Sequence, residues 1–215
     1  MATQKNNALH GMVGDVVCYT LHGQKVARSR PHKYRDRKST KQLAQRERMR
    51  LANQFLSYWP QIVRHAFVVE SKTTITSYNR AKSLIMRHNI IGQYPNLYLD
   101  YAKIRMSISE EKVITQLKAH RVGAELHLQI TNATKRQPTH LTLYLLLLVE
   151  GDPVQLGPFS WPNNNYLTVP LPDHLSKTEE MHLWLVPYDP LEQHYYESYY
   201  TNCMDLVEAQ GMGHR

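Results

Sequence analysis

Residues 141–149 have the sequence LTLYLLLLV, the longest apolar run in the chain of 215 residues. The run is far shorter than the roughly 20 residues that a membrane-spanning helix needs. Turn-forming residues follow it directly, in the order Gly151, Asp152 and Pro153. We therefore expect a buried β-strand here.

Shorter strand-like segments lie on both sides of this run, and turn signals separate them. They cover residues 104–108, 126–130, 166–169, 181–186 and 195–201. Six or seven short strands at this spacing are typical of an antiparallel sandwich of the immunoglobulin type. The only cysteines, Cys18 and Cys203, lie near opposite ends of the chain. Since the cysteine pair of antibody domains is missing, we expect a fibronectin-like sandwich.

The residues before this region predict a hairpin followed by helices. Residues 12–29 are rich in β-branched side chains around a turn at Gly23, as in a β-hairpin. Ser39 with Gln42 three residues later forms a capping-box pattern, which predicts a helix to about residue 58. Pro60 suits the first turn of a second, short helix, and Ser77 could cap a third over 78–88.

These elements predict an α+β protein of two domains. Residues 1–97 form a basic hairpin-and-helix module, and residues 98–215 form the β-sandwich. The net charge of +8 is divided in the same way, because residues 1–97 hold 17 Lys and Arg against 4 Asp and Glu. Residues 98–215 hold 9 against 14. Such an asymmetry favours polyanionic partners for the first part.

The basic segment between residues 25 and 50 is the best candidate site. Lysine and arginine neutralise phosphates and release counterions, and a tyrosine can stack on a base. We expect polyanion contacts from Arg28, Arg30, Lys33, Tyr34, Arg35, Arg37, Lys38, Arg46 and Arg50. The alternatives are an acidic protein surface, including the β half of the same or a neighbouring chain, and a solvated linker without a specific partner.

A tyrosine cluster near the C-terminus is a candidate protein-contact surface. Strand alternation would put Tyr196 and Tyr200 on one face and Tyr195 and Tyr199 on the other. One face would be core, and the face with Tyr196 and Tyr200 could bind a protein, since tyrosine is enriched at interfaces. An exposed tyrosine pair without a partner is the alternative.

Motifs of enzymes and metal sites are missing from the sequence. There is no Gly-x-Ser-x-Gly elbow, phosphate-binding glycine loop or His-Glu-x-x-His, and none of the 12 histidines has a ligand spacing. We therefore expect no catalytic residue, metal, cofactor or small-molecule substrate. The first residues lack the apolar segment of a secretion signal, which favours a cytoplasmic protein that does not enter a membrane.

Three N-terminal motifs carry a resemblance to a known family. They are Gly11-Met12-Val13-Gly14-Asp15-Val16-Val17, Arg28-Ser29-Arg30-Pro31 and Gln42-Leu43-Ala44-Gln45-Arg46. The pattern resembles an uncharacterised family abundant in Bacteroidota, with a Gly-Lys-Val-Gly-Asn-Val-Val hairpin, an Arg-Ser-x-Pro segment and an Ala-Gln-x-x-Arg helix.

The resemblance continues through Tyr94-Pro95 and Asp100-Tyr101, and it implies an Ig-like C-terminal β domain. It departs from the family pattern at Met12, where lysine is usual, and at Cys18, where small residues are common. The N-terminal motif is also similar, more loosely, to proteins of tailed phages and prophages. No site residue is implied by either likeness.

Together these features predict a non-enzymatic structural or adaptor protein. Its basic module would bind a polyanion, nucleic acid in the first place, and its sandwich would make protein contacts. The alternative is a phage- or prophage-derived virion or assembly component. It would form a symmetric homo-oligomer in which the basic segment meets neighbouring acidic sandwiches.

Overall fold

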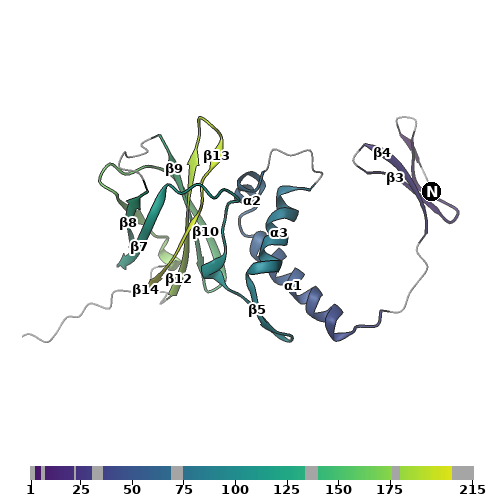
Figure 1. Ribbon diagram of the computed structural model, residues 1–215, viewed down its shortest axis with the longest axis horizontal. Coiled ribbons are helices and arrows are strands. Elements are labelled where there is room, and N and C mark those ends of the chain that lie inside the picture. Colours follow the sequence, from purple (N-terminus) through teal and green to yellow (C-terminus); the bar gives the residue numbers. More distant parts are fainter. Residues whose placement is uncertain are drawn as a thin grey trace, which may run out of the picture. The chain divides into compact units, whose positions relative to one another are not determined.

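The structure is a computed structural model that describes residues 3–5, 8–21, 23–30, 36–68, 75–133, 140–175 and 180–204. The chain divides into two compact units (Figure 1). The first unit comprises Met1–Ser39 with Lys72–Thr74, and the second comprises Thr40–Ser71 with Ile75–Arg215.

The first unit contains a four-stranded antiparallel sheet. Its strands lie in chain order, β1 (Thr3–Lys5), β2 (Ala8–Val13), β3 (Val16–Leu21) and β4 (Gln24–Ser29). Gly14 and Gly23, at φ of +57° and +80°, provide the left-handed backbone that the two tight turns require. The predicted hairpin over 12–29 is part of this sheet, and none of the sheet's described side chains is buried.

Three helices open the second unit and confirm the helical prediction. They are α1 (Thr40–Leu56), α2 (Pro60–Ala66) and α3 (Ser77–His88), and α3 packs against both of the others. Pro60 stands in the first turn of α2, as expected. The cap of α3 is Thr76 rather than Ser77, because the Thr76 hydroxyl accepts a hydrogen bond from the Asn79 amide at 3.3 Å.

A small hairpin and an irregular segment connect the helices to the β region. The hairpin pairs β5 (Ile90–Gln93) with β6 (Asn96–Leu99) across a cis Tyr94-Pro95 bond, and the 3₁₀ helix η1 (Tyr101–Lys103) follows. The strand expected over 104–108 is wrong, since residues 104–113 form no strand. Ile104 and Met106 are buried, but side chains take the place of a partner strand: the Ile104 carbonyl oxygen accepts from Trp184 Nε1, and the Met106 amide donates to Ser198 Oγ.

Two antiparallel sheets form the rest of the second unit. One has the order β11-β8-β7, from β7 (Ile114–Val122), β8 (Glu125–Asn132) and β11 (Tyr166–Pro170). The other has the order β10-β9-β12-β13, with β14 also paired to β12. Its strands are β9 (Thr142–Val149), β10 (Asp152–Ser160), β12 (Glu180–Asp189), β13 (His194–Tyr195) and β14 (Tyr199–Met204). A short 3₁₀ helix, η2 (Asp173–Leu175), precedes β12.

Both faces of the five-stranded sheet are covered. On one face Leu146, Leu148 and Trp184 pack with Phe55 of α1 and with Trp59, the residue before α2, in what we call the helix-side core. On the other face a second group packs with the three-stranded sheet, in what we call the sheet-side core; it includes Leu126, Leu128, Leu145, Leu147, Leu183 and Leu185. This burial explains the continuous apolar run of β9 and confirms the buried strand.

The boundary between the two units differs from the predicted domain boundary, because the helices and the sheets of the second unit pack together. The chain was expected to divide at Leu97, but the helices share a core with the sheet, and the structure divides after Ser39. The fold is α+β with antiparallel sheets, as predicted. Within the described ranges, no helix is long and apolar enough to cross a membrane.

Candidate polyanion-binding surface

Part of the predicted basic segment lies in the first unit. Arg28, on β4, has its guanidinium carbon 5.7 Å from the centroid of the Tyr19 ring. The Arg30 amide donates to the Asp15 carbonyl oxygen at 2.6 Å, so the backbone after β4 is held to the β2–β3 turn. Arg37 and Lys38 are exposed. Lys33, Tyr34 and Arg35 lie outside the described residues.

The other two predicted contacts, Arg46 and Arg50, lie on α1 in the second unit and are exposed. Arg50 donates from Nε and Nη2 to the two carboxylate oxygens of Glu47, at 2.9 and 2.6 Å, and from Nη1 to Gln54. These hydrogen bonds raise the pKa of Arg50 and lower the pKa of Glu47. The charge of Arg50 is therefore already paired, which makes Arg50 a weaker candidate for a phosphate contact than the sequence suggested.

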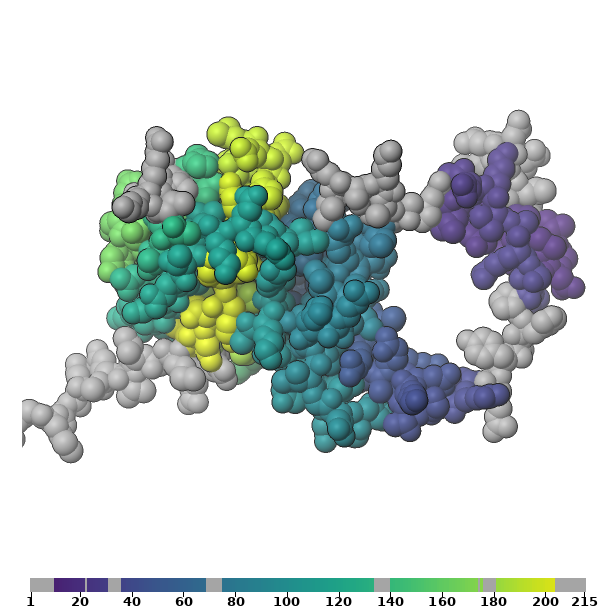
Figure 2. Space-filling model, viewed as in Figure 1, coloured from purple at the N-terminus to yellow at the C-terminus, as the bar shows by residue number. Residues whose placement is uncertain are grey.

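Basic charge follows the helical layer of the second unit. Residues 40–71 and 75–105 hold 10 Lys and Arg against 3 Asp and Glu, a net charge of +7. Residues 106–215 hold 7 against 13, a net charge of −6. In Figure 2 the helical layer is the blue-to-teal surface beside the sheets, whose colours run from teal in β7 to yellow in β14. Within the second unit, the helical layer thus has a positive net charge and the region of the sheets has a negative one.

A groove lies between α2 and α3 in this layer. Its volume is about 520 Å³, and it is lined by Pro60, Val63, Arg64, His65, Val68, Thr76, Ser77 and Tyr78. The groove lies at the N-terminal end of α3, whose first turn contains no acidic residue. The partial positive charge of a helix N-terminus and the exposed Arg64 both favour an anion there.

A smaller pocket of about 190 Å³ lies between α3 and η1. Ala81, Leu84 and Ile85 form its apolar wall, and Lys103, Arg105, His88 and Asn89 complete the lining. The Lys103 ammonium lies 2.7 Å from the Asp100 carboxylate, and this hydrogen bond raises the pKa of Lys103. Arg105 is 3.7 Å from Glu197 and 3.9 Å from Glu110. Acidic neighbours therefore offset part of the charge of this pocket.

The structure thus adds basic residues that the sequence analysis missed. Arg64, Lys103, Arg105 and two basic side chains of the last turn of α3, Arg87 and His88, lie in the helical layer. Neither the Arg64 nor the Arg87 side chain forms a hydrogen bond or ion pair with another described residue. The available signal was a basic pair at the end of two successive helices, Arg64-His65 and Arg87-His88.

The two tyrosines predicted to share a face lie on different cores. Tyr200 packs on the helix-side core, where its hydroxyl is 2.8 Å from His182 Nδ1. Tyr196 packs on the sheet-side core, with its ring edge-on to His194 at 4.9 Å. Strict alternation fails because residues 196–198 form no strand between β13 and β14. Both side chains are half-buried.

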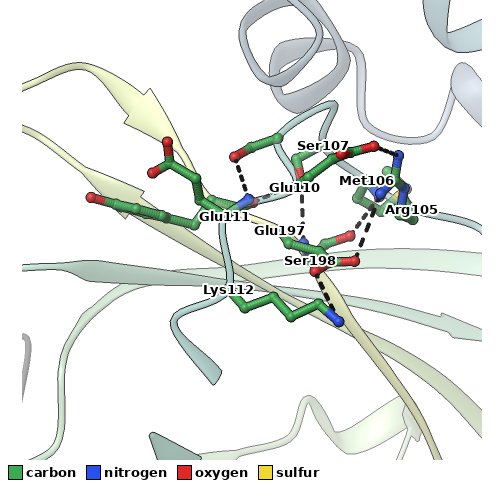
Figure 3. Close-up of polar contacts among 10 residues, drawn as sticks. Arg105, Met106, Ser107, Glu110, Glu111, Lys112, Glu197 and Ser198 are labelled. Atoms are coloured by element: carbon green, nitrogen blue, oxygen red, sulfur yellow. Dashed lines mark hydrogen bonds and ion pairs between the residues drawn. The ribbon is translucent and has the colours of Figure 1, made fainter. Parts of the chain in front are cut away.

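Hydrogen bonds of the Ser107 and Ser198 hydroxyls, which we call the seryl clasp, fix residues 196–198 between the two strands (Figure 3). The Ser107 hydroxyl donates to the Tyr196 carbonyl oxygen at 2.7 Å and accepts from the Ser198 amide at 3.1 Å. The Ser198 hydroxyl accepts from the Met106 amide at 2.7 Å. Beside the clasp, Glu197 lies 3.7 Å from Arg105 and 3.9 Å from Lys112. These contacts position the loop before β7 rather than a reacting group.

One serine, histidine and glutamate come together near the clasp. Ser109 Oγ is 3.4 Å from His194 Nε2, and Glu111 Oε2 is 3.9 Å from the same nitrogen. A catalytic triad needs the carboxylate on the opposite ring nitrogen, where it orients the imidazole. This arrangement therefore lacks triad geometry. In the described part of the chain, no three His, Cys, Asp or Glu side chains gather as metal ligands.

The fold and surface define an α+β protein with a basic helical layer and acidic sheets. The family of unknown function DUF6266 matches residues 8–132, more than half of the chain. The chain belongs to this family. A comparison with curated proteins gave no match.

Three solved structures show weak likeness. A family 76 glycoside hydrolase from a bovine Bacteroides thetaiotaomicron strain is 8% identical over 42% of this chain, with a TM-score of 0.31. A DUF3823 family protein from Bacteroides ovatus is 10% identical over 42% of this chain, with a TM-score of 0.29. This chain spans 20% and 52% of the lengths of those two proteins. The extracellular domains d3-d4 of rat CD45 are 7% identical over 89% of this chain and 95% of theirs, with a TM-score of 0.30. At these scores no property is carried over to this chain.

Proposed function

We propose that this protein is a non-enzymatic structural or adaptor protein that binds a polyanion, nucleic acid in the first place. The single observation that supports this is the concentration of basic charge on the helical layer, which includes Arg64 in the groove between α2 and α3. The contacts would be to phosphates, so binding would be strong at low salt and tolerant of sequence.

The β domain would make protein contacts in this proposal. Its two antiparallel sheets share the sheet-side core, which supports an immunoglobulin- or fibronectin-like sandwich. The likeness of the N-terminal motifs to proteins of Bacteroidota and of tailed phages supports an origin in those sources. Tyr196, half-buried beside exposed Glu111 and Glu192, is the candidate contact on this domain.

The test is fluorescence anisotropy of labelled single- and double-stranded oligonucleotides at low and then physiological salt. Arg64→Glu should weaken binding to all sequences alike, and should lower the slope of log affinity against log salt by about one. Lys118→Glu is the matched control, because this exposed lysine of β7 lies among the acidic sheets and the charge change is the same. Arg50→Ala should have a smaller effect than Arg64→Ala, since Arg50 is paired with Glu47.

Two results would contradict the proposal. One is an absence of binding at low salt. The other is an equal loss of affinity in Arg64→Glu and Lys118→Glu, which would show that only the net charge of the chain matters and not the groove.

A second candidate function, the assembly component that forms a symmetric oligomer, is supported by a different observation. The sheet of the first unit buries none of its described side chains, although it presents several large apolar residues. A single-layer sheet of this kind is completed by a partner surface.

A further inference from the structure

The smaller pocket between α3 and η1, which we call the η1 pocket, has walls that the backbone holds in place. The hairpin of β5 and β6 pairs Ile90 with Leu99, next to the end of α3 and the beginning of η1. The Asp100 amide then donates to the Asn89 carbonyl oxygen at 2.8 Å. The two elements that line the volume of about 190 Å³ are therefore tied together. A pocket that is formed in advance lowers the cost of ordering on binding.

Asn89 is a polar side chain of this pocket that its surroundings leave unsatisfied. The residue is only 5% exposed, yet its side-chain amide forms no hydrogen bond with another described residue. The amide is also not among the polar atoms that are sealed without a partner inside the described part of the protein. It therefore reaches the pocket that Asn89 lines. A buried amide without a partner is unfavourable, so one that opens into a pocket indicates a ligand.

Arg105 adds hydrogen-bond donors that the protein does not use. Its Nη1 is 3.7 Å from Glu197 and its Nη2 is 3.9 Å from Glu110, and both distances are too long for hydrogen bonds (Figure 3). A guanidinium presents its N–H groups in a planar fork that matches the two oxygens of a carboxylate. Lys103 uses one donor on Asp100 and keeps others. The acidic neighbours thus reduce the net charge but leave donors for an anion.

The wall that α3 contributes is apolar. Ala81 and Ile85 are buried and Leu84 is half-buried, and their spacing of three and four residues puts them on one face of the helix. An apolar cavity of about 150 Å³ is large enough to hold benzene. The η1 pocket therefore has room for an apolar body of that size together with one small polar group.

The end of α3 determines how such a ligand would lie. The last carbonyl groups of a helix carry a partial negative charge, which disfavours an anion against the last turn of α3. A carboxylate therefore belongs on the η1 side, with Arg105 and Lys103. The apolar body belongs against the wall of α3. Asn89, at the C-cap of α3, can donate to the carboxylate from its side-chain amide.

We propose that the η1 pocket binds a small monocarboxylate with a compact apolar body, such as an aromatic or branched aliphatic acid. Arg105 holds the carboxylate, the Asn89 amide donates to it, and α3 buries the apolar body. This ligand site goes beyond the proposed polyanion binding and does not rest on it. The experiment contains no nucleic acid, so that the two proposals can fail separately.

Benzoate is the probe, because it joins one carboxylate to a ring of the required size. In a ¹H–¹⁵N NMR titration of the full chain, saturable shifts should be largest for the amides of residues 81–89 and 103–105. Benzamide has the ring without the charge, whereas acetate and inorganic phosphate have the charge without the ring. Each of them should bind at least about tenfold more weakly than benzoate. An absence of saturable shifts, or equal affinity for any of the three, would overturn the proposal.

Two arginines give a matched pair of variants. Both Arg105→Gln and Arg87→Gln remove one positive charge, but Arg87, in the last turn of α3, does not line the pocket. Arg105→Gln should weaken benzoate binding at least about tenfold, because a hydrogen bond between charged groups is lost. Arg87→Gln should change the affinity by no more than about twofold, as for a distant surface charge. Equal losses in the two variants would contradict a specific contact of Arg105.

Asn89→Leu separates binding from folding. Leucine has a similar shape, and the replaced amide makes no internal hydrogen bond, so the main thermal transition should not fall. Benzoate binding should nevertheless weaken several-fold, because the ligand loses a donor. Unchanged binding would overturn the role of Asn89. A lower thermal transition would show that the amide serves the fold instead of a ligand, and would overturn it as well.

Discussion

The two units of this protein are both built on antiparallel strands, but only one of them covers its strands. In the second unit, alternate residues of β9 face opposite cores, with Leu146 on the helix side and Leu147 on the sheet side. In the first unit, β3 carries two adjacent valines and a tyrosine and buries none of its described side chains. Strand-forming sequence therefore makes a sheet in both units, and the covering layers decide which sheet has a core.

The strongest way to test this difference is to remove a large side chain of the sheet that packs against the helices. Trp184 is fully buried, its Nε1 donates to the Ile104 carbonyl oxygen at 3.0 Å, and its ring contacts Phe55 and Trp59. Trp184→Ala should reduce the free energy of unfolding by about 3–5 kcal/mol. For a unit of this size, the main thermal transition should fall by about 6–20 °C.

The matched control is Tyr19→Ala in the N-terminal sheet. It also deletes an aromatic ring from a strand, but it removes no atom from either core of the second unit. The main thermal transition, measured by circular dichroism or calorimetry, should not move. A similar decrease of the transition temperature in both variants would mean that the two units unfold together. It would contradict the view that only the second unit has a buried core.

The seryl clasp provides a smaller effect within the second unit. Ser107→Ala would leave the Tyr196 carbonyl and the Ser198 amide without their hydrogen-bond partner. The expected loss is about 1–3 kcal/mol of unfolding free energy in chemical denaturation, since the groups lie in a buried site. Ser109→Ala removes a hydroxyl that accepts from the exposed Glu111 amide, and should cost no more than about 0.5 kcal/mol. Equal losses would show that the clasp does not fix the loop.

The fold was predictable from the sequence where the hydrophobic pattern agreed with the residues that begin or end helices and strands. The apolar run of β9 is buried on both faces, and Pro60 marks the beginning of α2. Strand β10 was missed, because Gly151, Asp152 and Pro153 indicated a turn, whereas the structure puts Pro153 and Pro158 inside an edge strand. An edge strand tolerates proline, since half of its amides have no partner strand. Local turn residues cannot show which strand will lie at an edge.

The sequence predicted that the candidate site is basic, but it did not predict where in the fold the site lies. Counting lysines and arginines identified the segment from Arg28 to Arg50, and the structure divides that segment between the two units. The groove by Arg64 depends on the packing of α2 against α3, which sequence spacing does not give. The prediction that Tyr196 and Tyr200 lie on one face was wrong for a related reason. Hydrogen bonds from Ser107, which is far away in the sequence, interrupt the strand between the two tyrosines.

The smallest predicted effect concerns the tyrosines of the second unit at alkaline pH. Burial raises the pKa of both Tyr195 and Tyr199 from 10.0 to about 12, with smaller contributions from Tyr144 and Tyr188 for the first and Glu197 for the second. A raised pKa means that the folded protein holds these protons more tightly than the unfolded chain does. Their contribution to stability is complete below pH 10 and is lost as the pH rises to about 12.

Tyr199→Phe isolates one of these groups. The Tyr199 hydroxyl is buried and has no hydrogen-bond partner among the described residues, so its removal should change stability little at neutral pH. The variant should instead lose less stability than the full chain over the alkaline range, measured as the shift of the denaturation midpoint. Tyrosinate absorbance should show a late-titrating group in the full chain that the variant lacks. A single ionisation step near pH 10 in the folded chain would show that these rings are as solvated as in the unfolded state, and that the cores of the second unit do not extend to β13 and β14.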